Sequence, residues 1–185
     1  MSAISAAVQL HTSHVSFRPL VEGVLARAGM PTTEKFKHGV AKVVLDFPLT
    51  WAFGQLEPLN SFERSHTVVC TQAHHPAYLD CLGSYHLSAV VDCTDENSLL
   101  GAVYAASAAQ RIYQYDSGLT YMELRVTRLL LMGHDTRELA RQLRISHKTV
   151  NAHVSNILCK LGYDSRAQYV AILMGAKSPS ASGSE

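Results

Sequence analysis

The sequence predicts an α/β domain, in which a parallel sheet is flanked by helices, followed by an all-α domain of four helices. Before residue 113, β-branched apolar runs of strand length alternate with amphipathic helical stretches, an order typical of a parallel sheet. After residue 119, apolar residues recur only at helical spacing, and the stretches follow helix N-cap signals. The length of 185 residues accommodates two such domains.

Each element of the first part follows from its residue types. The strands are short apolar runs at Ala7–His11, Val43–Phe47, Thr67–Thr71 and Ala89–Cys93, and the second and third of them are β-branched runs. The helices carry apolar residues along one side, at Phe17–Ala28, at Pro76–Leu82, which ends at Gly83, and from Glu96 to about Tyr113. Asp95 is the expected N-cap of the last of these helices.

The helices of the second part are delimited by capping signals. Thr120 with Glu123, and Asp135 with Glu138, have the spacing of a capping box, and Ser146 is a natural N-cap for a third helix. The first and third helices should end at Gly133 and near Gly162, and a fourth should run from about Ser165 to Met174.

The third of these helices has two different faces. Its apolar residues form one stripe, made of Val150, Val154, Ile157, Leu158 and Leu161. The opposite face is small and polar, with His147, Lys148, Asn151, Ala152 and Ser155. Such a face lets the backbone approach base edges in DNA, and an asparagine can bond adenine through two atoms. Lys148 and Lys160, near the two ends, suit phosphate contacts.

Charge is divided between the two parts. Residues 119–177 carry nine Lys or Arg and four Asp or Glu, whereas residues 1–118 carry seven and ten. A basic segment in an otherwise acidic chain is typical of a nucleic-acid-binding domain.

Other classes of protein are disfavoured by composition. No apolar run approaches the roughly 20 residues of a transmembrane helix, and the N-terminus lacks the basic region of a signal peptide, so a cytoplasmic protein is expected. The four cysteines lack the paired spacing of a zinc or thioredoxin-like site. No nucleophile–base pair or metal constellation is visible, so neither an enzyme nor a cofactor is expected.

The segment LTYMELRV…MGHDTRELARQLRIS…KTVNAHVSNILCKLGYDSR resembles the LuxR/NarL-type helix-turn-helix domain in register. The resemblance implies a sequence-specific transcription regulator that binds double-stranded DNA as a homodimer. Its base-facing positions would be Asn151, Ala152 and Ser155. The positions toward the DNA backbone would be Lys148, Thr149, His153 and Lys160, and His147 shares the same face.

Attached before such a domain, the β/α order resembles a response-regulator receiver domain. VVLDFPL resembles the strand that carries the phosphoacceptor, which would be Asp46. Thr71 would hold the family's hydroxyl position, and Asp92 would stand at the family's lysine position. The acidic pair that holds Mg²⁺ after the first strand is replaced by His11, Thr12 and Ser13.

These departures predict a degenerate receiver that acts independently of phosphorylation, because phosphoryl transfer depends on the metal and lysine charges. The span from the first strand to Asp46 is also about ten residues short for the family, which predicts that one strand–helix step is trimmed or remodelled. Dimerisation is the expected work of this half. The candidate surface is the helix Glu96–Tyr113, with Leu99, Leu100, Val103, Tyr104 and Ile112; simple core packing is its alternative.

Several alternatives stay open at this point. The receiver could work in a phosphorelay through Asp46, or the protein could be an auxiliary regulator that binds DNA only beside a partner protein. The basic helices could instead pack against a protein. A metal or haem sensor would draw on Cys70 or Cys93 and on His11, His14, His66, His74, His75 and His86. A small-molecule effector in the vacated phosphorylation pocket is a further candidate.

The predicted domain organisation has four parts. Residues 1–113 form the receiver-like domain, 114–118 a short linker, 119–176 the helix-turn-helix domain and 177–185 a disordered tail of small and polar residues.

Overall fold

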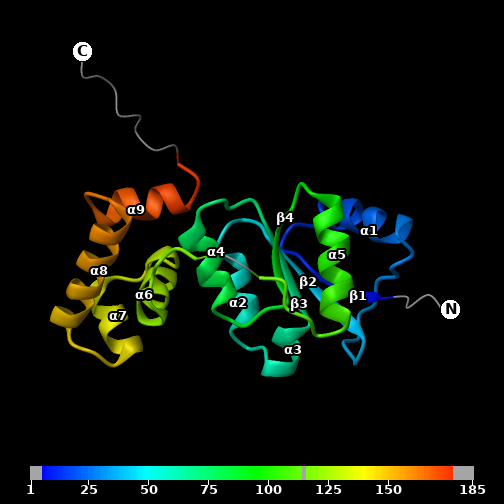
Figure 1. Cartoon of the computed structure of the whole chain (residues 1–185), viewed down its shortest axis with the longest axis horizontal. Helices are drawn as coiled ribbons and strands as arrows, with labels where there is room; N and C mark the ends of the chain where they lie inside the picture. Colours follow the sequence, from blue (N-terminus) through cyan, green and yellow to red (C-terminus); the bar gives the residue numbers. More distant parts are fainter. Residues whose placement is uncertain (1–5, 114–115, 177–185) are drawn as a thin grey trace, which may run out of the picture. The chain divides into compact units, whose positions relative to one another are not determined.

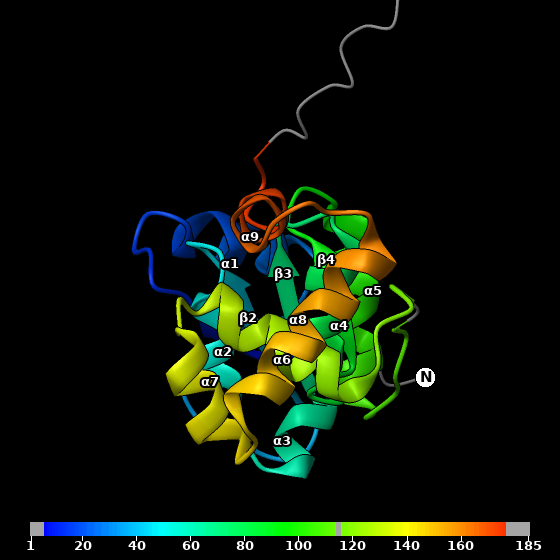
Figure 2. The same ribbon diagram turned by 90° about the vertical axis from the view of Figure 1, so that its left-hand side faces the viewer.

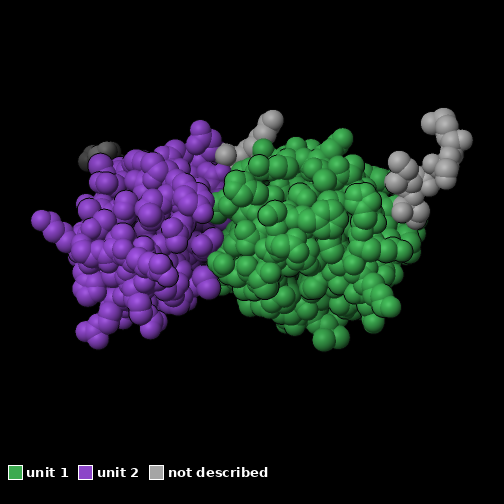
Figure 3. All heavy atoms as spheres, turned by 90° about the horizontal axis from the view of Figure 1, so that it is seen from below, with its two compact units in different colours: residues 1–72, 82–115 green, residues 73–81, 116–185 purple. Residues whose placement is uncertain are grey.

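The computed structural model describes residues 6–113 and 116–176 (Figure 1). Part of the predicted linker, residues 114–115, and the predicted tail, residues 177–185, lie outside the described residues. The chain forms two compact units, coloured separately in Figure 3. One comprises residues 1–72 and 82–115, and the other comprises residues 73–81 and 116–185.

The first unit contains a four-stranded parallel sheet in the order β1-β2-β3-β4. Its strands are β1 (Ala7–His11), β2 (Val40–Asp46), β3 (Thr67–Thr71) and β4 (Ala89–Asp92). Strands β2 and β3 are buried along their whole length, as expected for a parallel sheet covered on both faces. The predicted α/β class is therefore confirmed.

A rudimentary fifth strand lies beyond β1. Thr32 forms an isolated parallel bridge with Val8. The Val8 amide donates to Pro31 O at 2.9 Å, and the Thr33 amide donates to Val8 O at 2.8 Å. With this segment counted second along the chain, the sheet has the 2-1-3-4-5 order of doubly wound receiver folds. Among the described residues no helix separates the bridge from β2, in agreement with the prediction that one strand–helix step is trimmed or remodelled.

The two faces of the sheet have different covers. Helices α1 (Arg18–Arg27) and α5 (Glu96–Ser107) lie together on one face (Figure 1), where the core contains Val8, Leu10, Leu25, Val43, Leu45, Val68, Leu99, Val103 and Ala106. Between β2 and β3 the chain forms two short helices, α2 (Trp51–Leu56) and α3 (Ser61–Ser65), which the sequence analysis did not predict. Helix α2 packs against β2 and buries Ala52, Phe53 and Leu56.

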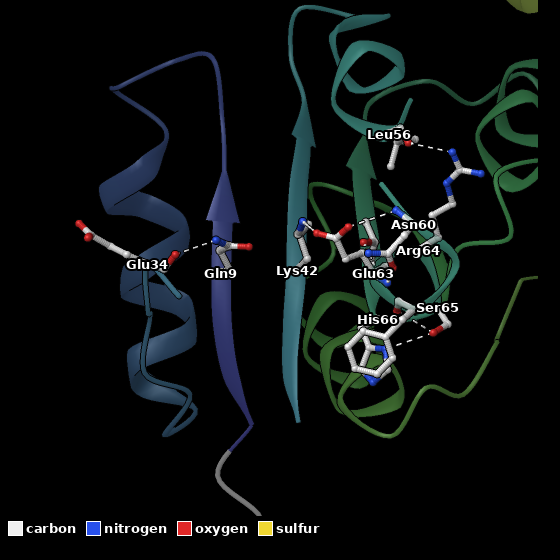
Figure 4. A network of polar contacts seen from close by, with 11 residues as sticks. Gln9, Glu34, Lys42, Leu56, Asn60, Glu63, Arg64, Ser65 and His66 are labelled. Atoms are coloured by element: carbon white, nitrogen blue, oxygen red, sulfur yellow. Dashed lines mark hydrogen bonds and ion pairs between the residues drawn. The ribbon is translucent and has the colours of Figure 1, made fainter. Parts of the chain in front are cut away.

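Strand β2 begins at Val40, three residues earlier than predicted. The difference arises at Lys42, a charged residue that is buried inside the strand. Lys42 is 5% exposed, and its Nζ donates to Glu63 Oε1 of α3 at 3.0 Å (Figure 4). Asn60 and Glu63 also form the capping box that opens α3. The ion pair with Glu63 neutralises the charge of Lys42. A charged residue is atypical of a buried strand, so residues 40–42 were not predicted to belong to it.

Helix α5 is shorter than predicted. It ends at Ser107 and not near Tyr113, because Ala109 adopts a φ of +53° and the chain turns back. The Ile112 amide then donates to Ser88 O at 2.8 Å, just before β4. Leu99 and Val103 are buried in the core, so of the predicted dimer surface only Tyr104 and Ile112 are well exposed, and Ile112 is outside the helix.

The second unit contains the four predicted helices, α6 (Tyr121–Leu131), α7 (Thr136–Leu143), α8 (His147–Leu161) and α9 (Arg166–Leu173), together with residues 73–81, which include most of α4 (Pro76–Gly83). Helix α8 packs against α6, α7 and α9 (Figure 2). The capping boxes predicted at Thr120 and Asp135 are both present. In the described part of the chain, no helix is long and apolar enough to cross a membrane.

Candidate nucleic-acid interface

The start of α8 is fixed by local backbone and side-chain geometry. Arg144, after α7, adopts a left-handed φ of +55°, and the Ile145 amide donates to Ala140 O at 3.1 Å, which closes the turn. Ser146 then caps α8, because its Oγ accepts from the Thr149 amide at 3.0 Å. The α7–turn–α8 pair therefore presents the first turn of α8 in a defined position, as a helix-turn-helix requires.

The two faces of α8 separate as the sequence predicts. Val150 and Ile157 are completely buried and hold the helix on its unit. His153 is half-buried, whereas the remaining predicted residues of the first three turns are exposed: His147, Lys148, Thr149, Asn151, Ala152 and Ser155. The structure thus brings these six residues together on one side of one helix. The side chains of that face are small or polar, and they carry a single formal positive charge, that of Lys148.

Lys160 stands apart from this group, near the C-terminal end of α8. Its Nζ donates to Glu123 Oε2 at 2.7 Å, and the Glu123 side chain is 4% exposed. Burial alone would raise the pKa of Glu123, but hydrogen bonds from Lys160 and Thr120 outweigh it and leave the pKa below its ordinary value. The ammonium group of Lys160 thus helps to fasten α8 to the start of α6.

A basic hollow beside the start of α8 was missed by the sequence analysis. It is lined by Arg137 and Arg141 of α7 together with His147 and Lys148 of α8. Both arginines are exposed, as is Arg144 in the turn. The missed signal was the i, i+4 spacing of Arg137 and Arg141, which places both guanidinium groups on one side of α7. Arginine and lysine side chains around such a hollow are suited to phosphate oxygens.

The three predicted receiver positions meet at one edge of the sheet. Asp46 pairs in register with Thr71, and Thr71 pairs with Asp92. Asp46 is only 2% exposed: one carboxylate oxygen accepts from the Ala52 amide of α2 at 3.0 Å and the other from Thr71 Oγ1 at 3.1 Å. Asp92 Oδ1 accepts from the amide and the hydroxyl of Thr94, both at 2.7 Å.

These residues do not fit the magnesium ion of a receiver. Mg²⁺ needs oxygen ligands, usually carboxylates, yet His11 ends the first strand and Thr12 and Ser13 follow it. Burial, and then the positive charges of Lys42 and Arg18, lower the pKa of His11. The Arg18 guanidinium donates to Leu10 O at 3.0 Å beside this strand end, and the oxygens of Asp46 already accept hydrogen bonds from the protein.

The histidines do not assemble a metal site. Within residues 6–113 and 116–176, no group of three His, Cys, Asp or Glu side chains could hold a metal ion. His14 contacts Phe17 and Phe47, with ring centroids 5.5 and 5.4 Å apart. The ring of His66 lies 4.3 Å from that of Phe62. Aromatic packing thus accounts for two of the six candidate ligands.

Comparison with known sequences gives matches to about a third of the chain. The model of the family described as bacterial regulatory proteins, luxR family, matches residues 117–173. The spore germination protein GerE of Bacillus subtilis is 40% identical over 65 residues, which span 35% of this chain and 88% of GerE. The fimbriae Z protein of Salmonella typhimurium is 39% identical over 56 residues, 30% of this chain and 27% of that protein.

Solved structures extend the likeness to nearly the whole chain. RcsB from Salmonella enterica serovar Typhimurium, bound to promoter P1flhDC, superimposes with a TM-score of 0.61 at 15% identity, covering 93% of this chain and 100% of that chain. The same protein bound to promoter rprA gives 0.61 at 17% identity over 92% and 100%. At this identity the likeness concerns the fold: a receiver-like α/β part followed by a helix-turn-helix part.

Proposed function

The chain belongs to the luxR family of bacterial regulatory proteins, and from that premise we propose that it is a sequence-specific DNA-binding transcription regulator whose helix α8 enters the major groove. It is accordingly a regulatory protein and not an enzyme. The observation that carries the proposal is the face of α8, where six small or polar side chains are exposed behind a well-capped first turn. RcsB, which has a similar fold, is bound to promoter DNA in two solved structures.

Within this proposal the side chains divide into two roles. Asn151, Ala152 and Ser155 face the bases, and Asn151 supplies the bidentate contact. Lys148 and the arginines of the basic hollow bind phosphates, which gives affinity and salt dependence without sequence choice. Thr149 and His153 lie toward the DNA backbone. Lys160 also lies toward the DNA backbone, near the end of α8. Its ammonium group pairs with Glu123 and so holds this end of the helix in place.

We further propose that the protein binds DNA as a homodimer. A single α8 reads only a few base pairs, so two copies on two half-sites are needed for both affinity and defined spacing. RcsB dimers are bound to DNA in one of the similar structures. Sedimentation of the purified protein on a selected DNA site should give two protomers per duplex.

The base-reading role can be tested on DNA selected from a random library by the full-length protein. Asn151→Ala should lose about 1–3 kcal/mol of discrimination between selected and random DNA. Lys148→Ala should weaken binding to both DNAs about equally. The matched control is Asn97→Ala, an exposed asparagine on α5 of the first unit, which should bind like the wild type.

Two outcomes would contradict these assignments. Equal weakening of Asn151→Ala on selected and random DNA would remove its base-reading role. Failure of the purified protein to select any sequence would favour the auxiliary regulator that needs a partner protein.

We also propose that the regulator does not depend on phosphorylation. Asp46 is buried, and its oxygens are used as hydrogen-bond acceptors for Ala52 and Thr71. The acidic pair and the lysine of a receiver are absent from the corresponding positions. Incubation with acetyl phosphate and Mg²⁺ should therefore leave the intact mass and the DNA affinity unchanged. A phosphoryl adduct that disappears in Asp46→Asn would establish the phosphorelay alternative instead.

A further inference from the structure

A cavity of about 320 Å³ opens at the carboxyl edge of the sheet, on the face covered by α1 and α5. It is lined by Leu45 of β2, Cys70 of β3, Val21 and Val24 of α1 and Leu99 of α5. Ligands of open α/β sheets bind in the crevice at the carboxyl ends of the strands. The volume lies at the lower end of the range for small-molecule sites.

The mouth of the cavity exposes apolar surface to water. Leu20, which lines it, is 65% exposed. Phe17 and Phe47 contact each other at 4.9 Å between ring centroids and also line it. Apolar area removed from water contributes about 25 cal/mol per Å². A ligand that covered this mouth would therefore gain binding energy from the leucine and from both rings.

The polar residues at the cavity decide which ligands fit. Among the described residues that line it there is no lysine, arginine or histidine, and the two acids are Asp46 and Glu96. The carboxylate of Glu96 is paired at 3.3 Å with Arg27, which is not among the residues that line the cavity. The carboxylate of Asp46 accepts hydrogen bonds from the Ala52 amide and the Thr71 hydroxyl. An anionic ligand would thus find no cation. Gln72 and Thr94 can exchange hydrogen bonds with a single neutral polar group.

We propose that this cavity binds a neutral, largely apolar small molecule, whose one polar group faces Gln72 and Thr94. The ligand touches α1, the sheet and α5 at once, so its binding should stabilise the first unit. The proposal concerns this unit alone. It stands or falls independently of the DNA-binding role of α8.

The test uses the cysteines that the chain already contains. Cys93 is exposed and lines the cavity, Cys159 is exposed on α8, and Cys70 and Cys81 are buried. The full-length protein is labelled with N-ethylmaleimide in the presence of 2-naphthalenemethanol, 2-naphthoate or 2-naphthylmethylammonium, which share one apolar body and differ in charge. Peptide mass spectrometry gives the labelling rate of Cys93, with Cys159 as the internal reference.

The neutral probe should slow the labelling of Cys93 about tenfold at saturation and leave that of Cys159 unchanged. Leu20→Trp, at an exposed position in the mouth, should abolish heat release from the neutral probe in calorimetry. Ile112→Trp, at an apolar position that is 53% exposed and outside the cavity, should bind it like the wild type.

The proposal is overturned if the neutral probe does not protect Cys93, or if either charged probe protects as well as the neutral one. It is equally overturned if Leu20→Trp binds the neutral probe with unchanged affinity.

Discussion

Lys42 is a charged residue at the centre of a buried strand, and Glu63 is its counterion (Figure 4). The hydrogen bond from the Asn60 amide, and then that from Lys42, hold the pKa of Glu63 below its ordinary value of 4.5. A carboxylate whose pKa is lowered by folding stabilises the fold above its ordinary pKa. That stabilisation is lost as the pH falls through the lowered value.

Glu63→Gln should therefore lower the free energy of unfolding by about 3 kcal/mol at neutral pH, because it leaves the Lys42 ammonium buried without its counterion. The difference from the wild type should shrink as the pH falls below 4.5, where the carboxylate is protonated in the unfolded chain, and should be lost once the pH is below the lowered pKa of the folded state. Urea unfolding at a series of pH values measures both effects.

Glu22→Gln is the matched control for this prediction. Glu22 pairs with Arg18 at 3.1 Å on the surface of α1, where both side chains are at least a third exposed. Exposed pairs contribute little, so the change should be below about 1 kcal/mol at any pH. The double variant Lys42→Met/Glu63→Gln should recover part of the lost stability, because no unpaired charge remains. Equal losses in Glu63→Gln and Glu22→Gln would show that burial of Lys42 is unimportant.

At the scale of single elements, two glycines with open space around them should respond in opposite ways to alanine. Gly101 lies inside α5, and a Cβ there would meet nothing within 4 Å. Gly101→Ala should stabilise the protein by about 0.5–1 kcal/mol, since alanine has the better helix propensity. Gly162 also has open space but adopts a φ of +73° at the end of α8.

Gly162→Ala should destabilise the protein by about 1–2 kcal/mol, because a Cβ is strained in the left-handed region. Midpoints of urea unfolding, followed by circular dichroism, compare the two variants. A similar shift in both would mean that space, and not backbone conformation, controls these positions.

The same distinction between local and distant causes explains which elements could be predicted. The helices of the second unit follow from capping residues three positions apart, such as Thr120 with Glu123, so the sequence alone locates them. Helix α2 has no such signal. Its N-cap residue, Thr50, adopts a φ of +78° and forms no side-chain cap. The Ala52 amide donates its hydrogen bond to the Asp46 carboxylate of β2 instead. Helix α3 did carry a signal, the Asn60–Glu63 box, which went unrecognised.

At the scale of the whole molecule, positive charge is concentrated in the second unit near α7 and α8. Four exposed cations, Arg137, Arg141, Arg144 and Lys148, lie on α7, on the turn and at the start of α8. If each cation of both protomers in a dimer binds one phosphate, about eight phosphates are contacted. A plot of the logarithm of the binding constant against the logarithm of the salt concentration should then have a slope of about −7.

Arg141→Ala removes one such contact per protomer and should reduce the slope by about 2 in a dimer. Arg27→Ala, which removes an exposed cation of the first unit, is the control and should leave the slope unchanged. Fluorescence anisotropy of labelled DNA at several salt concentrations measures both. An unchanged slope in Arg141→Ala would place the basic hollow outside the DNA interface.

The candidate DNA-binding face could be predicted because one helix carries it, so spacing along the chain defines it. The basic hollow could not be predicted in this way, because it combines side chains of two helices across a turn. The same holds for the edge of the sheet. Asp46, Thr71 and Asp92 were placed by resemblance, but the hydrogen bonds that occupy Asp46 depend on α2, which only the folded chain reveals.

The capping of α2 by Asp46 has an optical consequence. Trp51 is the only tryptophan in the sequence and the first residue of α2. The next residue is Ala52, whose amide donates a hydrogen bond to Asp46. Any event that released this carboxylate would disturb the first turn of α2 and therefore the surroundings of the indole ring. The emission of this single tryptophan, excited selectively, thus reports on the strand end where a receiver would carry its phosphoryl group, without any label.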